Sequence, residues 1–124
     1  MKTEIDEDSV KNLLAYYTKN SNEGNAREVA AQYAPDATIE IVGSTRVSGL
    51  TDIFQSLRAE YAEPGRKPPK VHTDDIHLHA TGQYAFAYET CVEADGSICK
   101  VWMKLGIVNG CLCILEEQIL CIKH

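Results

Sequence analysis

The sequence is short of positive charge and has no long apolar run. Its 124 residues include 12 Lys or Arg and 18 Asp or Glu, which gives a formal net charge of -6 at pH 7. Binding to phosphates needs clustered Lys and Arg, so this balance argues against nucleic acid or an anionic membrane as a partner. No apolar stretch approaches the ~20 residues that cross a bilayer, and residues 1–9 lack the apolar core of a signal peptide. We therefore expect a cytoplasmic protein without a membrane partner.

The chain also lacks linkers, repeats and low-complexity segments. With 124 residues, 44% hydrophobic and 24% charged, it has the size and balance of one globular domain. A chain of this length buries roughly two thirds of its unfolded surface, which is enough for a core without metal or disulfide staples. We therefore expect residues 1–124 to form a single domain.

Cysteine is too irregular for a disulfide framework. The five cysteines are odd in number and all fall within predicted strands: Cys91, Cys99, Cys111, Cys113 and Cys121. We interpret them as free, mostly buried thiols in a reducing compartment. The pair in Cys111-x-Cys113 shares one strand face, but this spacing is only a weak hint of metal binding. We expect neither a metal nor a cofactor.

Three segments in the first half have the apolar periodicity of amphipathic helices. The first begins near Asp8 or Ser9, and the second follows Asn25, with Glu28 as its partner in a capping box. Pro35 ends the second helix, because the residue before a proline disfavours helical backbone. The apolar stripes are Val10, Leu13, Leu14 and Tyr17; Ala26, Val29, Ala30 and Tyr33; and Leu50, Ile53, Phe54, Leu57 and Tyr61.

Strand-like segments make up the rest of the chain. A β-branched strand from Ala37 to Val42 turns at Gly43-Ser44 and returns at Thr45 to Ser48. Four longer strands follow: Lys70 to Ala80, Tyr84 to Ala94, Ile98 to Val108 and Cys111 to Ile122. Asp95-Gly96 and Asn109-Gly110, which separate the last three, are strong signals of tight hairpins. The order predicts an α+β fold in which a curved antiparallel sheet wraps around three N-terminal helices and forms a cone-shaped pocket.

Alternation along the strands predicts which side chains face the helices. In the second long strand, the aromatic set of Tyr84, Phe86 and Tyr88 is the better candidate for the inner face. In the third, the inner set is the apolar one that includes Val101 and Met103. Phe86 and Tyr88, together with Phe54 of the third helix, would then form an aromatic wall of the cavity.

The last strand is apolar on both faces, whereas the outer face of a sheet in a monomer should be polar. We therefore predict a homodimer through the outer sheet face. Four residues are expected at the seam: Trp102, Leu112, Ile114 and Leu120. The alternative is a C-terminal strand that is simply rich in β-forming residues.

The first half of the chain carries the motifs of a known family. Tyr17 lies on the first helix, Asn22-Glu23-Gly24-Asn25 precedes the second, Tyr33 to Ile39 reads YAPDATI, and Ser48-Gly49 leads into the third. This pattern resembles the nuclear transport factor 2-like superfamily, and within it the branch of ketosteroid isomerases and SnoaL-like polyketide cyclases. The resemblance implies the cone-shaped fold over nearly the whole chain, and its motifs extend to about Leu57.

The same resemblance implies roles for three positions. Ketosteroid isomerases use an Asp base and an oxyanion hole formed by a Tyr and a protonated Asp. Tyr17 is similar in position to the oxyanion-hole tyrosine, Ile41 to the base, and Met103 to the protonated Asp. Two of the three groups are thus replaced by apolar residues, so we expect chemistry other than steroid isomerisation.

Other polar residues would then have to supply the chemistry. By strand alternation His72 and Asp74 share a face with the apolar Ile76, which predicts a general base and its orienting carboxylate at the pocket mouth. Tyr17 would donate a hydrogen bond to a carbonyl or enolate oxygen. Burial would raise the pKa of an inward Glu117, so that it acts as acid or base.

Each of these assignments has a plainer alternative. His72 and Asp74 could form a surface pair, Tyr17 could be a core tyrosine bonded to a buried polar group, and Glu117 could pair with a Lys at the dimer seam. The other histidines of the same strand point to the opposite face, so the histidines do not predict a metal site.

Together these features favour a protein that binds an apolar small molecule. The hypothesis is a cofactor-independent isomerase, cyclase or dehydratase that moves a proton on a carbonyl-bearing substrate. The catalytic candidates are Tyr17, His72, Asp74 and Glu117, and the substrate-binding candidates are Tyr33, Ile41, Phe54, Leu57, Phe86, Tyr88 and Met103. The alternative is a non-catalytic ligand-binding or dimerisation module of the same fold. Epoxide hydrolysis, which uses an Arg and two Asp in members of this superfamily, is disfavoured because no Arg follows Arg66.

Overall fold

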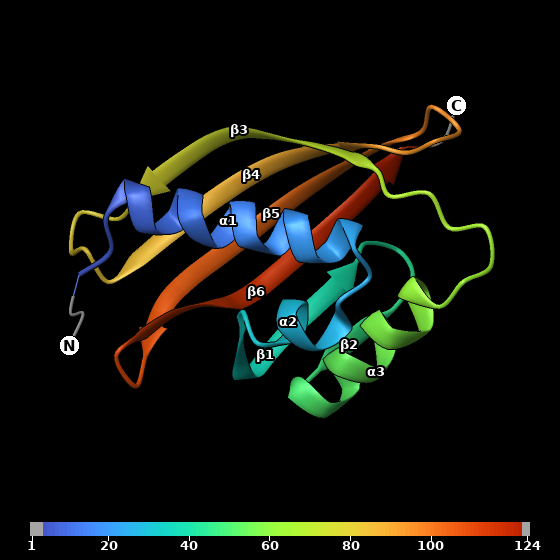
Figure 1. The fold of residues 1–124 in the computed structure, drawn as a ribbon. Coiled ribbons are helices and arrows are strands. Elements are labelled where there is room, and N and C mark those ends of the chain that lie inside the picture. Colours follow the sequence, from blue (N-terminus) through green and yellow to red (C-terminus); the bar gives the residue numbers. More distant parts are fainter. Residues whose placement is uncertain (1–3, 123–124) are drawn as a thin grey trace.

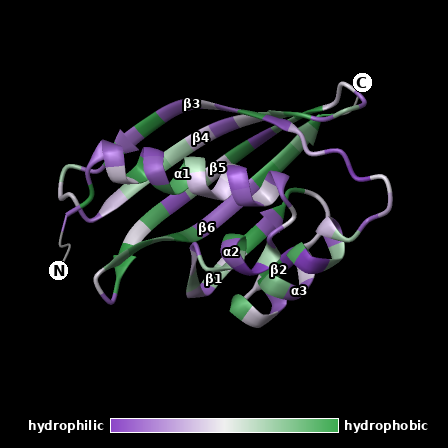
Figure 2. Ribbon diagram, in the orientation of Figure 1, coloured by the Kyte–Doolittle hydropathy of each residue, from purple (hydrophilic) through white to green (hydrophobic). Residues whose placement is uncertain are grey.

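A computed structural model describes residues 4–122. Three helices and six strands follow one another in the predicted order (Figure 1). They are α1 (Glu7–Asn22), α2 (Ala26–Ala30), β1 (Tyr33–Ile41), β2 (Arg46–Ser48), α3 (Leu50–Tyr61), β3 (Lys70–Leu78), β4 (Tyr84–Val92), β5 (Ile98–Val108) and β6 (Cys111–Ile122). α1 lies across the sheet, with contacts to β3 and β6, and α3 packs beside β1 and β2. Hydrophobic and hydrophilic residues alternate along these elements, as two-faced helices and strands require (Figure 2).

The six strands form one sheet in the order β2-β1-β6-β5-β4-β3. All neighbouring strands are antiparallel except β1 and β6, which run parallel. The predicted α+β class is therefore confirmed, and the sheet is mixed rather than wholly antiparallel. The parallel pair arises because β1 enters from α2 and meets the last strand of the meander, so the joint is between distant parts of the chain.

The helix starts are only partly as predicted. Asp6 caps α1 by accepting a hydrogen bond of 2.7 Å from the backbone N–H of Ser9, close to the expected start. The predicted capping box of α2 is not formed, because the Asn25 side chain makes no hydrogen bond to the first turn of the helix. The Glu28 carboxylate instead accepts a hydrogen bond of 2.7 Å from the Tyr16 hydroxyl on α1, which ties the two helices together.

The loop between β4 and β5 is one residue longer than the predicted Asp95-Gly96 turn. The backbone N–H of Glu93 bonds to the carbonyl of Ser97 at 2.9 Å, which leaves a three-residue loop closed by Gly96 at φ 89°. One residue of register reverses every side chain of a strand. β4 therefore turns Ala85, Ala87 and Glu89 toward the helices. The predicted inner placement of Phe86 and Tyr88 is wrong: both lie on the outer face.

An irregularity in β6 has a similar effect. Leu105 pairs with Ile114, whereas Lys104 pairs with Glu116, so Leu115 is an extra residue in the strand. This bulge lets both Ile114 and Glu117 face inward, although they are an odd number of residues apart. Ile114 is fully buried in the core, so its predicted place at a dimer seam is wrong.

Two of the five cysteines are bonded to each other. Cys99 and Cys121 are opposite residues of β5 and β6, and they form a disulfide. The prediction of five free thiols is therefore wrong for this pair, while Cys91, Cys111 and Cys113 are free. The pairing depends on register between strands, which an odd cysteine count does not reveal. Over residues 4–122, the helices are too short or too polar to span a membrane.

Candidate ligand-binding site

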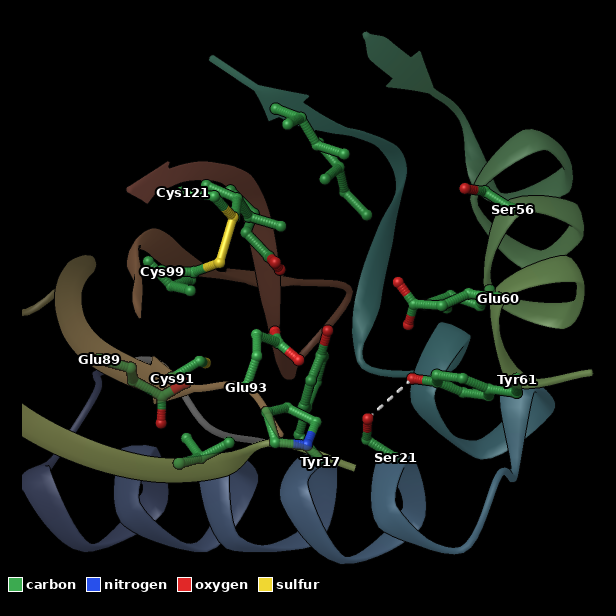
Figure 3. A pocket seen from close by; sticks show the side chains of 18 of the residues that line it. Tyr17, Ser21, Ser56, Glu60, Tyr61, Glu89, Cys91, Glu93, Cys99 and Cys121 are labelled. Atoms are coloured by element: carbon green, nitrogen blue, oxygen red, sulfur yellow. Dashed lines mark hydrogen bonds between the residues drawn. A yellow bond between two sulfur atoms is a disulfide. The ribbon is translucent and has the colours of Figure 1, made fainter. Parts of the chain in front are cut away.

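A cavity of about 530 Å³ lies between the helices and the inner face of the sheet (Figure 3). Its volume falls within the ~300–1,000 Å³ that is typical of small-molecule sites. The apolar part of its wall comes mainly from six residues of β1, α3, β5 and β6: Ile39, Ile41, Leu57, Val101, Met103 and Ile119. The wall also contains polar side chains from helices, strands and loops. The cavity is therefore mainly apolar, with a few polar groups at fixed positions.

Five of the predicted site residues line this cavity: Tyr17, Ile41, Leu57, Met103 and Glu117. Tyr33 is buried beside the cavity. Its hydroxyl is hydrogen-bonded to Tyr17 and Glu117, which do line it. Phe54 packs against the core, with the guanidinium of Arg58 6.0 Å from its ring centroid, and does not line the cavity. The expected substrate contact of Phe54 is therefore not supported.

Tyr17, Tyr33 and Glu117 form a hydrogen-bonded chain at the base of the cavity. The Tyr33 hydroxyl donates to Oε1 of Glu117 at 2.5 Å, and the two tyrosine hydroxyls are 2.9 Å apart. Tyr33 has one proton, which it gives to Glu117, so Tyr17 donates in the bond between the hydroxyls. α1, β1 and β6 each supply one member, and the parallel pairing of β1 and β6 joins two of these elements.

Burial controls the protonation of this chain. Glu117 is 4% exposed, and desolvation raises the pKa of its carboxyl to about 7. The bond from Tyr33 opposes this shift, and the negative charges of Glu89 and Glu60 add to it. Burial also raises the pKa of both tyrosines well above their ordinary value, and the charge of Glu117 adds to the effect. Near neutral pH, therefore, Glu117 is poised to gain or lose a proton while the tyrosines keep theirs.

Three further carboxylates, none of them predicted from the sequence, line the cavity: Glu60, Glu89 and Glu93. Glu89 is 4% exposed and accepts a hydrogen bond of 3.1 Å from the hydroxyl of Thr73. Burial raises the pKa of Glu89 and of Glu60. The signal for Glu89 was its alternation with Ala85 and Ala87, which becomes an inner face only once the three-residue loop is known.

Polar and sulfur-containing groups complete the wall (Figure 3). The Tyr61 hydroxyl on α3 donates to Oγ of Ser21 on α1 at 3.0 Å, which joins two helices at the cavity. The Cys99–Cys121 disulfide and the free thiol of Cys91 also face it. Burial and the nearby acids raise the pKa of Cys91 to about 12, so this thiol stays protonated and weakly nucleophilic.

His72 and Asp74 do not reach the cavity. Thr73 pairs with Glu89 and Asp75 with Tyr88, so Asp74 is an extra residue that reverses the alternation of β3. The His72 ring is 80% exposed, with Nε2 3.8 Å from Oδ1 of Asp74. The predicted placement of this pair at the pocket mouth is therefore wrong.

Instead, the pair belongs to a polar cluster on the sheet surface. Asp74 accepts a hydrogen bond of 2.5 Å from Thr90 and lies 3.9 Å from the Lys100 ammonium. The expected aromatic wall is on that surface too: Phe86 stacks on Trp102 with 6.0 Å between ring centroids, and Tyr88 is 41% exposed. Within residues 4–122, no three His, Cys, Asp or Glu side chains are placed to hold a metal ion.

No protein-family model matches the sequence, and no curated protein matches it either. Solved structures, however, match nearly the whole chain. A domain of unknown function with a cystatin-like fold from Nostoc punctiforme gives a TM-score of 0.83 at 12% identity, covering 99% of this chain and 81% of that one. A nuclear transport factor 2-like protein from Methylobacillus flagellatus gives 0.75 at 19% identity, covering 98% and 97%. A ketosteroid isomerase-like protein from Erwinia carotovora atroseptica gives 0.76 at 14% identity, covering 97% and 100%.

The chain therefore has the nuclear transport factor 2-like, or cystatin-like, fold. The likeness to this superfamily that the first half of the sequence indicates is confirmed in the fold. Structures at these identities define an architecture with a pocket and not a reaction, because unrelated activities share such a fold.

Proposed function

We propose that the protein is a cofactor-independent isomerase, cyclase or dehydratase that moves a proton on an apolar, carbonyl-bearing molecule held in the cavity. The observation that carries this proposal is the buried Glu117 carboxyl, with a pKa of about 7, bonded through Tyr33 to Tyr17 inside an apolar cavity. A carboxyl poised near neutral pH exchanges protons efficiently in both directions, which is what general acid–base catalysis needs.

The hydrogen-bonded chain also supplies a way to stabilise the negative charge that forms. Ionised Glu117 takes a proton on Oε2 from a carbon next to the carbonyl, because Oε1 already accepts the Tyr33 proton. Rotation of the protonated carboxyl then turns its O–H toward Tyr33, so that Glu117 becomes the donor. Tyr33 then donates to Tyr17, and the hydroxyl of Tyr17 is free to donate into the cavity. Proton transfer followed by rotation of the carboxyl thus reverses the chain and places a hydrogen-bond donor at the enolate oxygen. Return of the proton to another carbon completes an isomerisation.

Hydrogen exchange at carbon tests this proposal without knowledge of the natural substrate. The probe is 2-tetralone, an apolar ketone small enough for the cavity, and the readout is loss of its α-hydrogen signal in D₂O by NMR. We expect the protein to accelerate exchange and the rate to rise with pH until Glu117 is ionised, near pH 7. Loss of a general base typically costs 10²–10⁴-fold, so Glu117→Gln should reduce the rate by at least about 100-fold.

Glu116→Gln is the matched control, because Glu116 is next in sequence but exposed on the outer face. It should leave the rate unchanged. Tyr17→Phe should lower the rate less than Glu117→Gln, since it removes the donor and not the base. A wild-type rate no higher than that of Glu117→Gln would show that the carboxyl is not a base.

Association of two copies is a second candidate function, favoured by the outer sheet face. Five residues form an outer-face patch: Tyr84, Phe86, Tyr88, Trp102 and Leu120. Tyr84, Tyr88 and Leu120 are 39%, 41% and 47% exposed, which is high for apolar residues of a central sheet. Trp102 and Leu120 of the predicted seam belong to this patch. Ile114 and Leu112 do not, because Ile114 is in the core and Leu112 packs against the core.

Light scattering coupled to size-exclusion chromatography tests this association. The wild type should elute with the mass of a dimer, and Tyr88→Glu combined with Leu120→Glu should elute as a monomer. Gln55→Glu, an exposed change on α3 and away from the outer sheet face, is the control and should remain dimeric. A wild-type monomer at tens of micromolar would contradict the proposal and leave the cavity as the functional feature.

A further inference from the structure

The charges around the cavity are distributed unevenly. The carboxylates come from three regular elements and one loop: Glu60 from α3, Glu89 from β4, Glu117 from β6, and Glu93 just after β4. The cavity lining has no Lys or Arg from the described helices or strands. Its two basic members, Arg66 and Lys67, lie in the loop between α3 and β3. Arg66 packs over the Tyr61 ring at 4.4 Å, so its charge is held at the α3 side of the cavity.

The two most buried carboxylates have neutral hydrogen-bond partners. Glu89 accepts from a threonine hydroxyl and Glu117 from a tyrosine hydroxyl, so neither bond brings a positive charge. Each of these bonds uses one oxygen of its carboxylate. Among the described residues, every fully buried side-chain oxygen has a hydrogen-bond partner. The second oxygen of each carboxylate is therefore either bonded or still accessible, and both residues line the cavity.

Of the three carboxylates that the proton-transfer chemistry leaves unused, Glu89 is the most buried. It is 4% exposed, it lies on a different strand from Glu117, and it accepts a hydrogen bond from Thr73. The cleft between α1 and β3 also reaches it. Lys11 and Lys19 line that cleft together with Glu7, Asp74 and Asp75, and the Lys11 ammonium lies 3.6 Å from the Glu7 carboxylate. A buried carboxylate without a cationic partner is costly, and a ligand that brings a positive charge removes that cost.

We infer that the ligand of this cavity carries a protonated amine on its apolar body, and that the ammonium binds to the Glu89 carboxylate. The inference rests on the proposed function, because it concerns the same cavity and adds the charge of its substrate. The ammonium donates to Glu89 while the carbonyl lies at Tyr17 and Glu117, so two fixed points orient one molecule. Carboxylate or phosphate ligands are disfavoured, because they would add negative charge beside four acids.

Three probes with one apolar body and different charges test the inference: 2-naphthylmethylamine, 2-naphthylmethanol and 2-naphthoate. Isothermal titration calorimetry at pH 8 gives their dissociation constants for the wild type. We expect the amine to bind at least about tenfold more tightly than the alcohol, since a buried charge-assisted hydrogen bond replaces an unpaired charge. The naphthoate should bind more weakly than the alcohol.

Glu89→Gln keeps the shape of the side chain and removes its charge. In this variant the preference for the amine over the alcohol should fall to within about threefold, while the alcohol binds as in the wild type. Glu116→Gln, on the outer face, is the control and should keep the full preference. Circular dichroism should show that both variants are folded, and Glu89→Gln should not be less stable, because it removes a buried charge.

The outcomes separate the inference from the proposed function. Equal affinities for amine and alcohol in the wild type, or an amine preference that survives in Glu89→Gln, would overturn the inference and leave a neutral-ligand cavity. Tighter binding of the naphthoate would overturn it more strongly. If none of the three probes bound while Glu117-dependent exchange of 2-tetralone was observed, the inference would fail and the proposed function would stand.

Discussion

The two faces of the sheet differ in a way that the local sequence does not suggest: buried acids lie on the inner face and exposed aromatic rings on the outer face. The inner face, under the helices, contains the buried carboxylates Glu89 and Glu117 beside small or flexible residues. The outer face carries the aromatic side chains Phe86, Tyr88 and Trp102. The difference teaches that residue type alone does not decide which face is buried. A pocket needs small side chains to leave room and acids to act, whereas aromatic rings on an open face suit contact with another surface.

The largest expected effect comes from Ile114 on the inner face. Ile114 is fully buried, so Ile114→Ala should lower the free energy of unfolding by about 2–5 kcal/mol. Leu120→Ala, on the outer face of the same strand, should cost less than about 1 kcal/mol, since Leu120 is 47% exposed. Urea denaturation at low protein concentration, where subunit contacts do not contribute, measures both. Equal losses would show that the bulge at Leu115 does not exist.

The next effect is a pH dependence that belongs to the inner face. The pKa of Glu117 rises from 4.5 to about 7 on folding, so the folded protein binds a proton that the unfolded chain releases. Stability should therefore fall as pH rises from about 4.5 to 7, by at most about 3 kcal/mol from this group. Glu117→Gln should flatten that fall, as measured by urea denaturation at pH 5 and pH 8. If the stability of the variant depended on pH as that of the wild type does, the pKa of Glu117 would not be raised and its carboxyl would be exposed to solvent.

Reduction of the Cys99–Cys121 disulfide should have a comparable or smaller effect. The bond links residues 22 apart in the sequence, for which the loss of chain entropy in the unfolded state is worth about 3 kcal/mol. Residual structure in the reduced, unfolded chain lowers this value, so we expect a loss of about 1–3 kcal/mol on addition of a phosphine reductant. Cys91→Ala should leave the difference between oxidised and reduced protein intact. A reductant effect that persists in Cys99→Ala would mean that another bond is responsible.

The smallest effect is expected for His72 on the sheet surface. Because its ring is 80% exposed and does not line the cavity, His72→Ala should change stability by less than about 0.5 kcal/mol. It should also leave the exchange of 2-tetralone hydrogens unchanged. This result would separate the outer polar cluster from the cavity. A strong loss of exchange activity would instead restore His72 as the base and contradict the assignment of Glu117.

The candidate site could be predicted only where local pattern and true geometry agree. Tyr17 lies on a helix whose stripe is unambiguous, so its place in the cavity follows from periodicity. Glu117 was found among apolar neighbours on β6. His72 and Asp74 were misplaced because Asp74 is itself the extra residue of a bulge, and a bulge has no reliable signature in sequence. Glu89 was missed for the same kind of reason, a loop one residue longer than its Asp-Gly signal suggests.

By itself the sequence determined the order of helices and strands, the α+β class and the likeness to the nuclear transport factor 2-like fold. These depend on hydrophobic periodicity, glycine turns and short motifs, all of which act over a few neighbouring residues. The tertiary structure alone decided which strand faces look into the cavity, which cysteines pair and which acids are buried. The physical reason is that strand side chains alternate with a period of two, so a single extra residue in β3, in β6 or in the loop before β5 exchanges the two faces.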